Sequence, residues 1–334
     1  MQDQSHNLSE AEIEEIFQQW DTSKPVSIKK VETGLLNQTY IIRTAEELFI
    51  LQKLHPAVAI DACTVNYFHV TQYLFSLSQI SQLVSAKDTG TLWLDIDGAR
   101  WRLLKGVEGD VYTVTPNTSI AYEAGKLLAS FHSSLYEFPE PILPSLPMFQ
   151  YKQVLTKLLS YEAEFTKTNN QQVIEAFNLL KDNFPKQMLP DDLPTQIIHT
   201  DPKISNFLFD KNGKGICMID FDTIQELSPL YDIGDCVRSL CGKQEDDPNN
   251  YFDFEKYQAI VKGYNSVSHH LTQVEQDLIP QVCQLIMLGL ASRFLNDYID
   301  DNYFGWDNTK YPNRKAHNLA RVVGQISLWK SFTK

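Results

Sequence analysis

The stretch that decides the fold runs from residue 197 to residue 223 and reads IIHTDPKISNFLFDKNGKGICMIDFDT. Two short apolar segments flank the turn Asn212-Gly213, a pair that is typical of tight hairpins. Polar side chains gather at the ends of these segments: His199, Asp201, Asn206, Asp220 and Asp222. Because a hairpin brings the ends of its two strands together, we expect these groups to lie around one point.

This set of side chains matches what the transfer of a phosphoryl group from a nucleotide requires. One carboxylate must orient the attacking hydroxyl, and one or two oxygen ligands must hold Mg²⁺ against the phosphates. Asp201 and Asn206 share one loop, and Asp220 ends the next strand. Carboxylates gathered this closely would repel each other strongly without a cation between them. The stretch therefore predicts a Mg²⁺-dependent phosphoryl-transfer centre.

The bulk composition predicts an ordinary soluble globular protein. The chain has 334 residues, of which 43% are hydrophobic and 21% charged, and this length usually corresponds to about two domains. Its 29 Lys and Arg residues face 42 Asp and Glu residues, a formal net charge of −13. Nucleic-acid binding would favour a basic surface instead. We therefore expect small-molecule partners and no nucleic acid.

Cysteine usage and hydropathy predict a cytoplasmic protein. The five cysteines are dispersed without metal-site spacing, a pattern that favours reduced thiols over disulfides. The N-terminal segment is polar and acidic, without the apolar core of a signal peptide. No apolar run approaches the ~20 residues of a membrane span. We expect no membrane association, and either a monomer or a homodimer.

Periodicity along the chain predicts two lobes of different character. Ser9 and Glu12 have the spacing of a capping box, which places a first helix up to about Trp20. The N-terminal third then predicts a five-stranded antiparallel sheet with one inserted helix: strands in residues 26–31, 37–43, 47–53, 91–96 and 100–107, and a helix within 57–83. Helical patterns dominate afterwards: residues 120–135, 149–180 and 252–334. The sequence thus predicts an α+β fold with a β-rich lobe over residues 1–107 and a helical lobe over residues 108–334.

The motif His199-x-Asp201-x4-Asn206, followed by Ile219-Asp220-Phe221-Asp222, resembles the aminoglycoside phosphotransferase and choline kinase group, which has a two-lobed protein-kinase-like fold. Within that group the chain is most similar to the N-acetylhexosamine 1-kinases. The resemblance spans most of the chain and includes four further motifs: Gly34-x2-Asn37-x-Thr39-Tyr40, Tyr231-Asp232-x-Gly234-Asp235, Arg293-Phe294-Leu295-x-Asp297-Tyr298 and His317-Asn318-Leu319.

The resemblance implies ATP and Mg²⁺ as cofactors and assigns roles to individual residues. Asp201 would be the catalytic base, Lys203 would lie near the transferring phosphate, and Asn206 and Asp220 would hold Mg²⁺. His199 would fix the loop backbone. Residues 34–39 would cover the nucleotide phosphates and residues 105–109 would lie beside adenine. The implied nucleotide-binding residues are Asn37, Thr39, Lys53, Lys105 and Val107, and the implied acceptor-binding residues are Asp222, Arg293, Asp297, Arg314 and Asn318.

Several of these residues also have plain structural interpretations. Asp222 could cap a turn, and Arg293 and Asp297 have the spacing of an ordinary ion pair on one helix face. Asp232 and Asp235 would be structural carboxylates that cap a helix starting near Gly234 and bond to the catalytic loop.

The phosphate-binding cation is an open question. The third strand should offer a lysine, but Gln52 falls at that position and Lys53 follows it. Neighbouring strand residues face opposite sides, so only one of the two can face the nucleotide.

The leading hypothesis is a kinase that transfers the γ-phosphate of ATP to a sugar hydroxyl, specifically the anomeric hydroxyl of an N-acetylhexosamine, in carbohydrate metabolism. A second hypothesis keeps the fold and the reaction but changes the acceptor to an amino alcohol, an amino acid or an aminoglycoside. A third is a non-catalytic nucleotide-binding protein on a kinase fold, which the absence of a clear strand lysine favours and the intact Asp201, Asn206 and Asp220 oppose.

Overall fold

The structure is a computed structural model of the chain, and it describes residues 8–31, 37–75 and 80–334. Contacts divide the chain into two compact units. Unit 1 comprises residues 1–108 and 143–146, and unit 2 comprises residues 109–142 and 147–334. Mixed α and β structure in the first unit and mainly helical structure in the second agree with the predicted α+β fold class.

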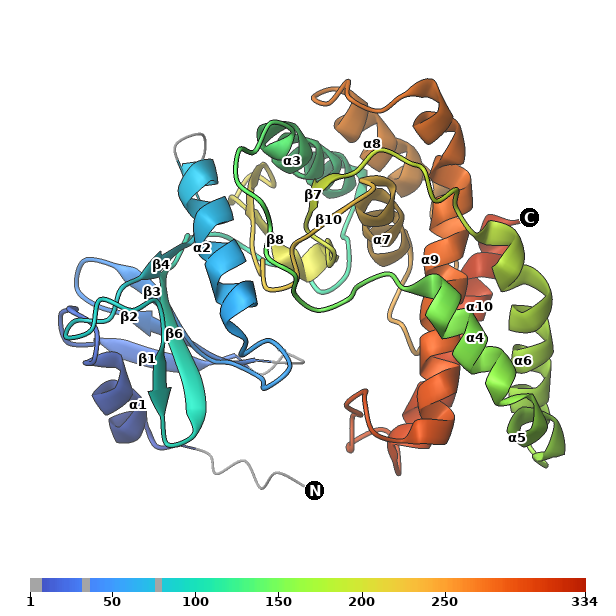
Figure 1. Cartoon of the computed structure of the whole chain (residues 1–334), viewed down its shortest axis with the longest axis horizontal. Helices are drawn as coiled ribbons and strands as arrows, with labels where there is room; N and C mark the ends of the chain where they lie inside the picture. Colours follow the sequence, from blue (N-terminus) through green and yellow to red (C-terminus); the bar gives the residue numbers. More distant parts are fainter. Residues whose placement is uncertain (1–7, 32–36, 76–79) are drawn as a thin grey trace. The chain divides into compact units, whose positions relative to one another are not determined.

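Unit 1 is built on an antiparallel sheet with the strand order β1-β2-β3-β6-β4, and β5 also pairs with β6 (Figure 1). Its strands are β1 (Ser27–Lys30), β2 (Gln38–Arg43), β3 (Leu48–Lys53), β4 (Gln82–Val84), β5 (Leu94–Ile96) and β6 (Ala99–Lys105), and its helices are α1 (Glu10–Phe17) and α2 (Asp61–Phe75). The prediction of five strands was wrong for the described residues. The segment 57–83 was expected to be helical, yet its end belongs to β4, because Gln82, Leu83 and Val84 pair with the buried end of β6.

The two faces of this sheet carry different side chains. Ile13 and Phe17 of α1 pack on one face against Phe49, Leu51 and Trp101, all of them buried. The predicted capping box starts α1, with the Ser9 side chain and the Glu12 side chain each bonded to the backbone of the other residue. Since side chains alternate along a strand, the intervening residues of β3 and β6 lie on the opposite face.

Unit 2 consists of helices with two small two-stranded sheets, β7 with β10 and β8 with β9. Its helices are α3 (Thr118–Leu135), α4 (Tyr151–Ser160), α5 (Glu162–Lys167), α6 (Gln171–Asn183), α7 (Leu230–Cys241), α8 (Phe254–Asn265), α9 (Gln273–Asp300) and α10 (Arg314–Phe332), with 3₁₀ turns η1 (Phe184–Gln187) and η2 (Ile204–Asn206). Its strands are β7 (Gln196–Ile198), β8 (Phe207–Phe209), β9 (Gly215–Met218) and β10 (Gln225–Leu227). The sequence did not predict β10, and the segment 149–180 forms three helices rather than one or two.

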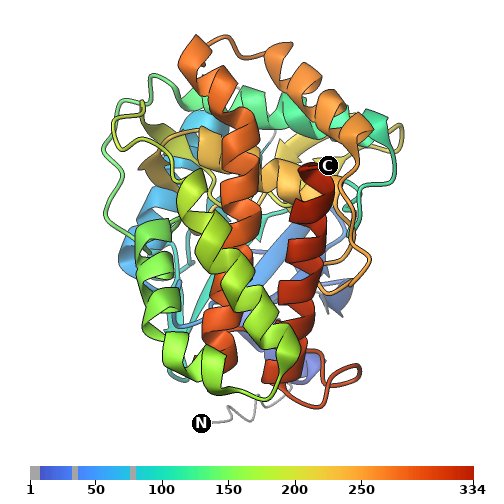
Figure 2. The same cartoon turned by 90° about the vertical axis from the view of Figure 1, so that its right-hand side faces the viewer.

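Helix α9 runs through the middle of unit 2, with α4, α6 and α10 beside it (Figure 2). By length and composition α9 could cross a membrane, but 67% of its most apolar window is buried inside the protein. That burial is what a core helix shows, because a core helix is apolar on most of its faces.

Helices α3 and α8 approach each other so closely that glycine is required where they cross. A Cβ atom at Gly125 would lie 2.2 Å from the Ile260 carbonyl oxygen, and one at Gly263 would lie 2.1 Å from the Tyr122 carbonyl oxygen. This crossing positions α3, whose His132 supports the loop described below.

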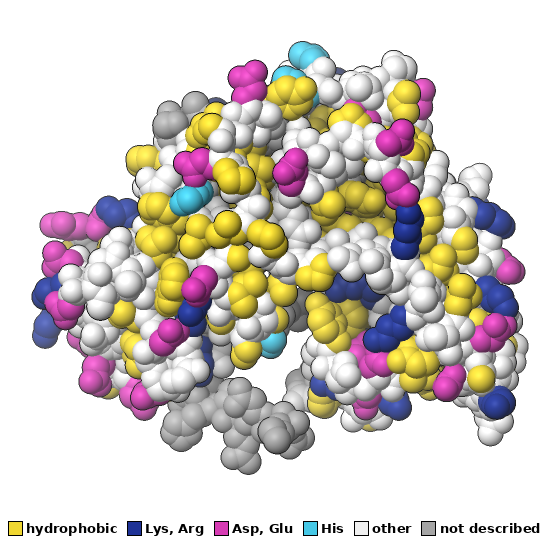
Figure 3. All heavy atoms as spheres, viewed as in Figure 1, with side chains coloured by type: hydrophobic (Ala, Val, Ile, Leu, Met, Phe, Trp, Pro, Cys, Tyr) yellow, Lys and Arg dark blue, Asp and Glu magenta, His cyan; other side chains and the backbone are white. Residues whose placement is uncertain are grey.

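The charged side chains on the face shown in Figure 3 are mixed, with acidic and basic groups interspersed. That face therefore carries no extended basic patch of the kind that nucleic acids bind. All five cysteines are buried and none forms a disulfide.

Candidate active site

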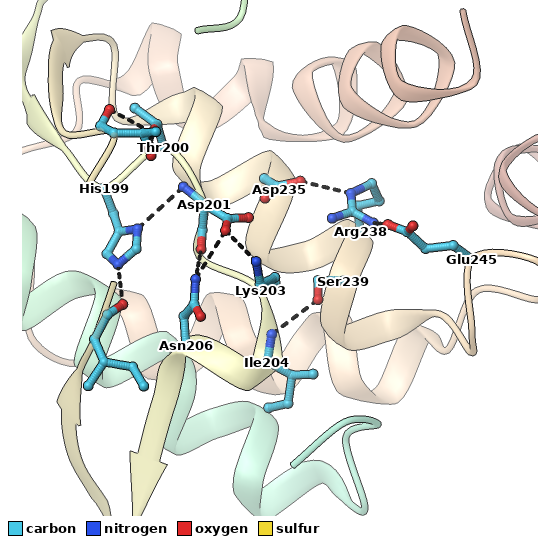
Figure 4. A network of polar contacts seen from close by, with 12 residues as sticks. His199, Thr200, Asp201, Lys203, Ile204, Asn206, Asp235, Arg238, Ser239 and Glu245 are labelled. Atoms are coloured by element: carbon cyan, nitrogen blue, oxygen red, sulfur yellow. Dashed lines mark hydrogen bonds and ion pairs between the residues drawn. The ribbon is translucent and has the colours of Figure 1, made fainter. Parts of the chain in front are cut away.

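The loop between β7 and β8 brings together Asp201, Lys203 and Asn206, which are three of the predicted site residues (Figure 4). Lys203 Nζ lies 2.6 Å from Asp201 Oδ2. Asn206 Nδ2 donates to the Asp201 carbonyl oxygen at 2.8 Å and to its carboxylate at 3.2 Å. The Asp201 side chain keeps 33% of its surface exposed. A half-open carboxylate, oriented by an amide and a lysine, is suited to accept a proton from a bound hydroxyl.

His199 and Thr200 hold the start of this loop in place. The buried His199 ring accepts the Asp201 N–H at Nδ1 and donates from Nε2 to the Ile219 carbonyl oxygen at 2.9 Å, which links the loop to the end of β9. Thr200 has a φ of 71°, a backbone conformation that costs energy for a residue with a branched side chain. The arrangement agrees with the structural role predicted for His199.

Asp232 is the anchor of this strained turn. Its buried carboxylate accepts the His199 N–H and the Thr200 N–H, each at 2.7 Å, and the His132 ring nitrogen at 3.0 Å. Helix α7 begins at Leu230 rather than near Gly234, so the predicted helix-capping role of Asp232 and Asp235 was wrong. Asp232 lies inside the first turn, and its carboxylate bonds to the catalytic loop, as the sequence predicted.

We expect Asp232→Ala to destabilise unit 2 by about 3–5 kcal/mol, because it leaves three buried donors without their acceptor. Turnover should fall as well, since the strained Thr200 loses the bond that holds it. Thermal unfolding and a steady-state assay measure both effects. Asp182→Ala, on the exposed side of α6, is the matched control and should leave both unchanged. A wild-type melting temperature in Asp232→Ala would contradict the anchoring role.

Asp220 directly follows the β8–β9 hairpin, at the end where Asn206 lies. The Ile219 N–H donates to the Asn206 carbonyl oxygen at 3.0 Å, and Phe207 pairs with Met218. Asp220 also has a φ of 71°. Burial, and then the neighbouring charge of Asp222, raise the pKa of Asp220 to about 6, while Lys203 opposes them. A nearby cation would stabilise the ionised carboxylate of Asp220, because burial and the charge of Asp222 disfavour that ionised form.

These residues fit a divalent metal bound together with a nucleotide. Asn206 directs its amide nitrogen at Asp201, which leaves the amide oxygen as its metal-binding atom. Among the described residues, no cluster of three His, Cys, Asp or Glu side chains is placed to hold a metal. Mg²⁺ commonly binds through one or two protein oxygens and completes its shell with phosphate oxygens and water. Asn206 and Asp220 would supply those protein ligands.

The charges of Lys203 and of the Asp235–Arg238 pair set the electrostatic field around the loop. Burial alone would lower the pKa of Lys203, but Asp201 and Asp220 raise it, so the lysine stays protonated. Burial raises the pKa of Asp235, and Arg238 opposes that rise through a 2.8 Å hydrogen bond. Arg238 also reaches Glu245 at 3.2 Å (Figure 4). Lys203 is therefore a permanent cation directly beside Asp201.

The implied nucleotide-binding residues all belong to unit 1. Asn37 accepts the His55 N–H at 2.9 Å, and Lys105 pairs with Glu47 at 2.8 Å. In the described part of the chain, neither the N–H nor the carbonyl oxygen of Val107 has a hydrogen-bond partner, which is what contact with adenine would need. The predicted turn at residues 34–36 lies outside the described residues.

The structure resolves which way the third strand faces. Gln52 pairs across the sheet with Thr39 on one side and Arg102 on the other. Lys53 pairs with Trp101, which lies in the core beside α1. Gln52 and Lys53 therefore occupy opposite faces, and Arg102 shares the face of Gln52. Arg102 was not among the predicted site residues. Its signal in the sequence is a single charge among the apolar residues Trp101, Leu103 and Leu104, all of which are buried in the structure.

The implied acceptor-binding residues separate into two groups. Asp297 is buried and accepts the N–H groups of Asn302, Tyr303 and Phe304 and the Asn318 amide, at 2.9–3.1 Å. Burial alone would raise the pKa of Asp297, but these donors lower it overall. Arg314 likewise donates to the Phe304 and Asp301 carbonyl oxygens. These contacts fix the loop after α9.

Arg293 and Asp222 differ from that group. Arg293 does not pair with Asp297. Its guanidinium lies over the rings of Tyr303 and Phe304, and among the described residues it has no carboxylate partner. Asp222 is buried beside Asp220 and contributes to its raised pKa.

A cavity of about 150 Å³ opens in unit 2 close to α7. Phe149, Tyr151 and Tyr231 line it, and the Phe149 and Tyr231 rings are stacked at 5.1 Å. Tyr231 lies one helical turn before Asp235 on α7.

Comparison with known proteins gives one family. The model of the phosphotransferase enzyme family matches residues 27–259. Relatives in sequence include a homoserine kinase of Agrobacterium fabrum, 24% identical over 86% of this chain and 84% of that one. A homoserine kinase of Gluconobacter oxydans is 26% identical over 90% of each chain.

Solved structures similar to this chain are small-molecule kinases. A microcompartment-associated aminopropanol kinase has a TM-score of 0.68 at 17% identity, with 97% of both chains covered. An amicoumacin kinase in complex with AMP-PNP and Ca²⁺ has a TM-score of 0.65 at 15% identity, covering 96% of this chain and 93% of that one. At such identities the likeness shows the fold, which is the protein-kinase-like fold.

Proposed function

The chain belongs to the phosphotransferase enzyme family, and from that premise we propose that it transfers the γ-phosphate of ATP to the anomeric hydroxyl of an N-acetylhexosamine. The observation that carries the proposal is the loop in which Asp201, Lys203 and Asn206 contact one another at the end of the hairpin that bears Asp220. That is the set of groups which phosphoryl transfer needs.

In this proposal Asp201 accepts the proton of the acceptor hydroxyl as that oxygen attacks the γ-phosphorus and the bond to ADP breaks. Lys203, fixed 2.6 Å from Asp201, places a positive charge beside the transferring group. A bound Mg²⁺ ion would neutralise the phosphate charge, with Asn206 and Asp220 as its protein ligands. Catalysis of this kind rests on positioning and on charge rather than on a covalent intermediate.

The carboxylates around the loop argue against a polycationic acceptor such as an aminoglycoside. Asp232, Asp235, Glu245 and Asp297 are each engaged by donors of the protein itself. A polycation would need several carboxylates that its ammonium groups could pair with. A neutral hydroxylated acceptor needs none.

Homoserine is a second candidate acceptor, favoured by two specific observations. Relatives at 24–26% identity are homoserine kinases. Arg293 has a guanidinium without a carboxylate partner among the described residues, and a guanidinium binds a carboxylate well. The same group could equally donate to the oxygens of a sugar.

An acceptor panel separates these candidates. Purified protein with Mg·ATP is supplied with N-acetylhexosamines, unacetylated hexosamines, homoserine, aminopropanol and an aminoglycoside, and ADP release is followed. We expect turnover with an N-acetylhexosamine and a product whose phosphate is released by mild acid, as from an anomeric position. Turnover with homoserine and an acid-stable product would replace the sugar assignment with the second candidate. If none of these acceptors stimulates ADP release, both the sugar assignment and the homoserine assignment are contradicted.

A further inference from the structure

Three polar side chains stand directly opposite one another across three strands of unit 1. Thr39 on β2 pairs with Gln52 on β3, and Gln52 pairs with Arg102 on β6. Directly paired side chains lie on the same face with Cβ atoms about 4.5–5.5 Å apart. The three therefore form a continuous polar row in a sheet whose other face is apolar.

Hydrogen bonds run along this row in one direction. Arg102 donates from Nε at 2.9 Å and from Nη2 at 2.7 Å to the Gln52 amide oxygen. The Gln52 amide nitrogen donates in turn to the Thr39 hydroxyl oxygen at 3.3 Å. Because that oxygen accepts, the Thr39 hydroxyl can direct its own proton outward. Donors arranged in such a chain polarise one another.

Packing alone does not explain an arginine at this position. Arg102 is 1% exposed, and its guanidinium lies 4.7 Å above the Tyr67 ring of α2. Its neighbours on β6, Trp101, Leu103 and Leu104, are buried and apolar. Burying a charge is costly unless hydrogen bonds compensate it, and the Gln52 amide oxygen takes two N–H groups of this guanidinium.

The row occupies the place where this fold needs a cation. In protein kinases a lysine on the third strand contacts the nucleotide phosphates. Here Gln52 stands at the third-strand position that the resemblance gives to that lysine, and Lys53 lies on the opposite face with Trp101. Arg102 stands one strand further along, and adjacent strands are only about 4.8 Å apart. Its charge can reach the surface through Gln52 and Thr39.

We propose that Arg102 is the positioning residue for nucleotide binding in unit 1, and that its charge acts on the ATP phosphates through the Gln52 and Thr39 side chains. The inference rests on the proposed kinase function. In place of one lysine that touches phosphate, the chain uses a buried arginine that orients and polarises a glutamine and a threonine, whose hydroxyl donates to a phosphate oxygen.

The test is the binding of Mg·ATP to the full-length protein without any acceptor, measured by calorimetric titration. Arg102→Met and Thr39→Val should each weaken binding about tenfold, the effect of losing one strong hydrogen bond. If Arg102 and Thr39 act through one row of hydrogen bonds, the Mg·ATP affinity of the double variant should be little lower than that of either single variant. Gln52→Lys in the Arg102→Met protein puts a cation on the third strand and should recover most of the affinity.

Arg100→Met is the matched control. Arg100 lies on the same strand and the same face, but pairs with Asp61 and Asp95, so its loss should leave Mg·ATP affinity unchanged. Melting temperatures show whether each variant is folded. Wild-type Mg·ATP affinity in Arg102→Met, or additive effects of Arg102→Met and Thr39→Val, would overturn this inference and leave the proposed kinase function standing. A wild-type protein that binds no Mg·ATP would overturn the proposed function together with it.

Discussion

Replacing Asp201 by asparagine should lower kcat about 10²–10⁴-fold, the range that a positioned general base contributes. Asparagine keeps the size of the side chain but cannot take the proton of the acceptor hydroxyl. Since Asp201 lies beside Lys203 and Asn206 rather than in the protein core, the variant should fold normally. Mg·ATP affinity should stay close to wild type, because Asp201 is not one of the proposed metal ligands.

The measurement is a single-turnover assay beside a nucleotide titration. Asp182→Asn, an exposed carboxylate on α6, controls for a general change of charge. Loss of nucleotide binding together with turnover would assign Asp201 a structural or metal-binding role instead of the role of a base.

Replacing Asp220 by asparagine should have opposite effects on activity and on stability. Turnover should fall by about 10²-fold or more, since a proposed Mg²⁺ ligand loses its charge. Metal-free protein should become more stable at neutral pH. Its pKa is raised from 3.8 to about 6, so the folded state binds this proton more tightly than the unfolded chain does.

The sign of the pH dependence follows from that shift. The contribution of Asp220 to stability is fully present below pH 3.8 and is lost as the pH rises through about 6. Above that pH, ionised Asp220 costs the metal-free fold about 1–3 kcal/mol, and asparagine removes this cost. Denaturant unfolding at about pH 3.5 and about pH 8 tests this dependence. The variant should gain stability at about pH 8 and gain little at about pH 3.5, which lies below the ordinary pKa of 3.8.

The Mg²⁺ affinity of the wild-type protein should depend on the ionisation of Asp220. Because Mg²⁺ binding needs ionised Asp220, affinity should fall by up to about tenfold for each pH unit below 6. Asp210→Asn, in the hairpin turn away from the loop, should keep the wild-type pH dependence of metal affinity. A flat metal affinity between pH 5 and pH 8 would contradict the placement of Asp220 at the metal.

Much of this fold could be predicted because local signals agreed with the tertiary structure. The capping box of Ser9 and Glu12 and the Asn212-Gly213 turn, where Gly213 has a φ of 78°, both lie where the sequence indicated. Each is a short-range signal with a backbone cause, namely a satisfied helix end or a positive φ.

Elements that depend on partners far away in the chain were missed. Strands β4 and β10 have three residues each and are strands only because β6 and β7 offer them unpaired edges. So short a segment carries no periodicity to detect. Helix α7 starts at Leu230, before Gly234, and Asp232 in its first turn binds the backbone of His199 and Thr200, which lie more than 30 residues away in the sequence.

The part of the site whose residues lie close together in the sequence could also be predicted. Asp201 and Asn206 immediately precede the β8–β9 hairpin and Asp220 follows it, so the pairing of Phe207 with Met218 brings them to one end. The pairing of Gln52 with Arg102 joins residues 50 positions apart. It became visible only when the register of β3 and β6 was known.

The most direct test of the account is phosphate transfer itself. Wild-type protein and Asp201→Asn are incubated with Mg·ATP and an N-acetylhexosamine, and the products are identified by mass spectrometry and phosphorus NMR. We expect ADP and a sugar phosphorylated at its anomeric oxygen from the wild-type protein, and unreacted sugar from the variant. The same yield of phosphorylated sugar from Asp201→Asn, or a wild-type protein that binds Mg·ATP and phosphorylates no hydroxyl, would contradict the account.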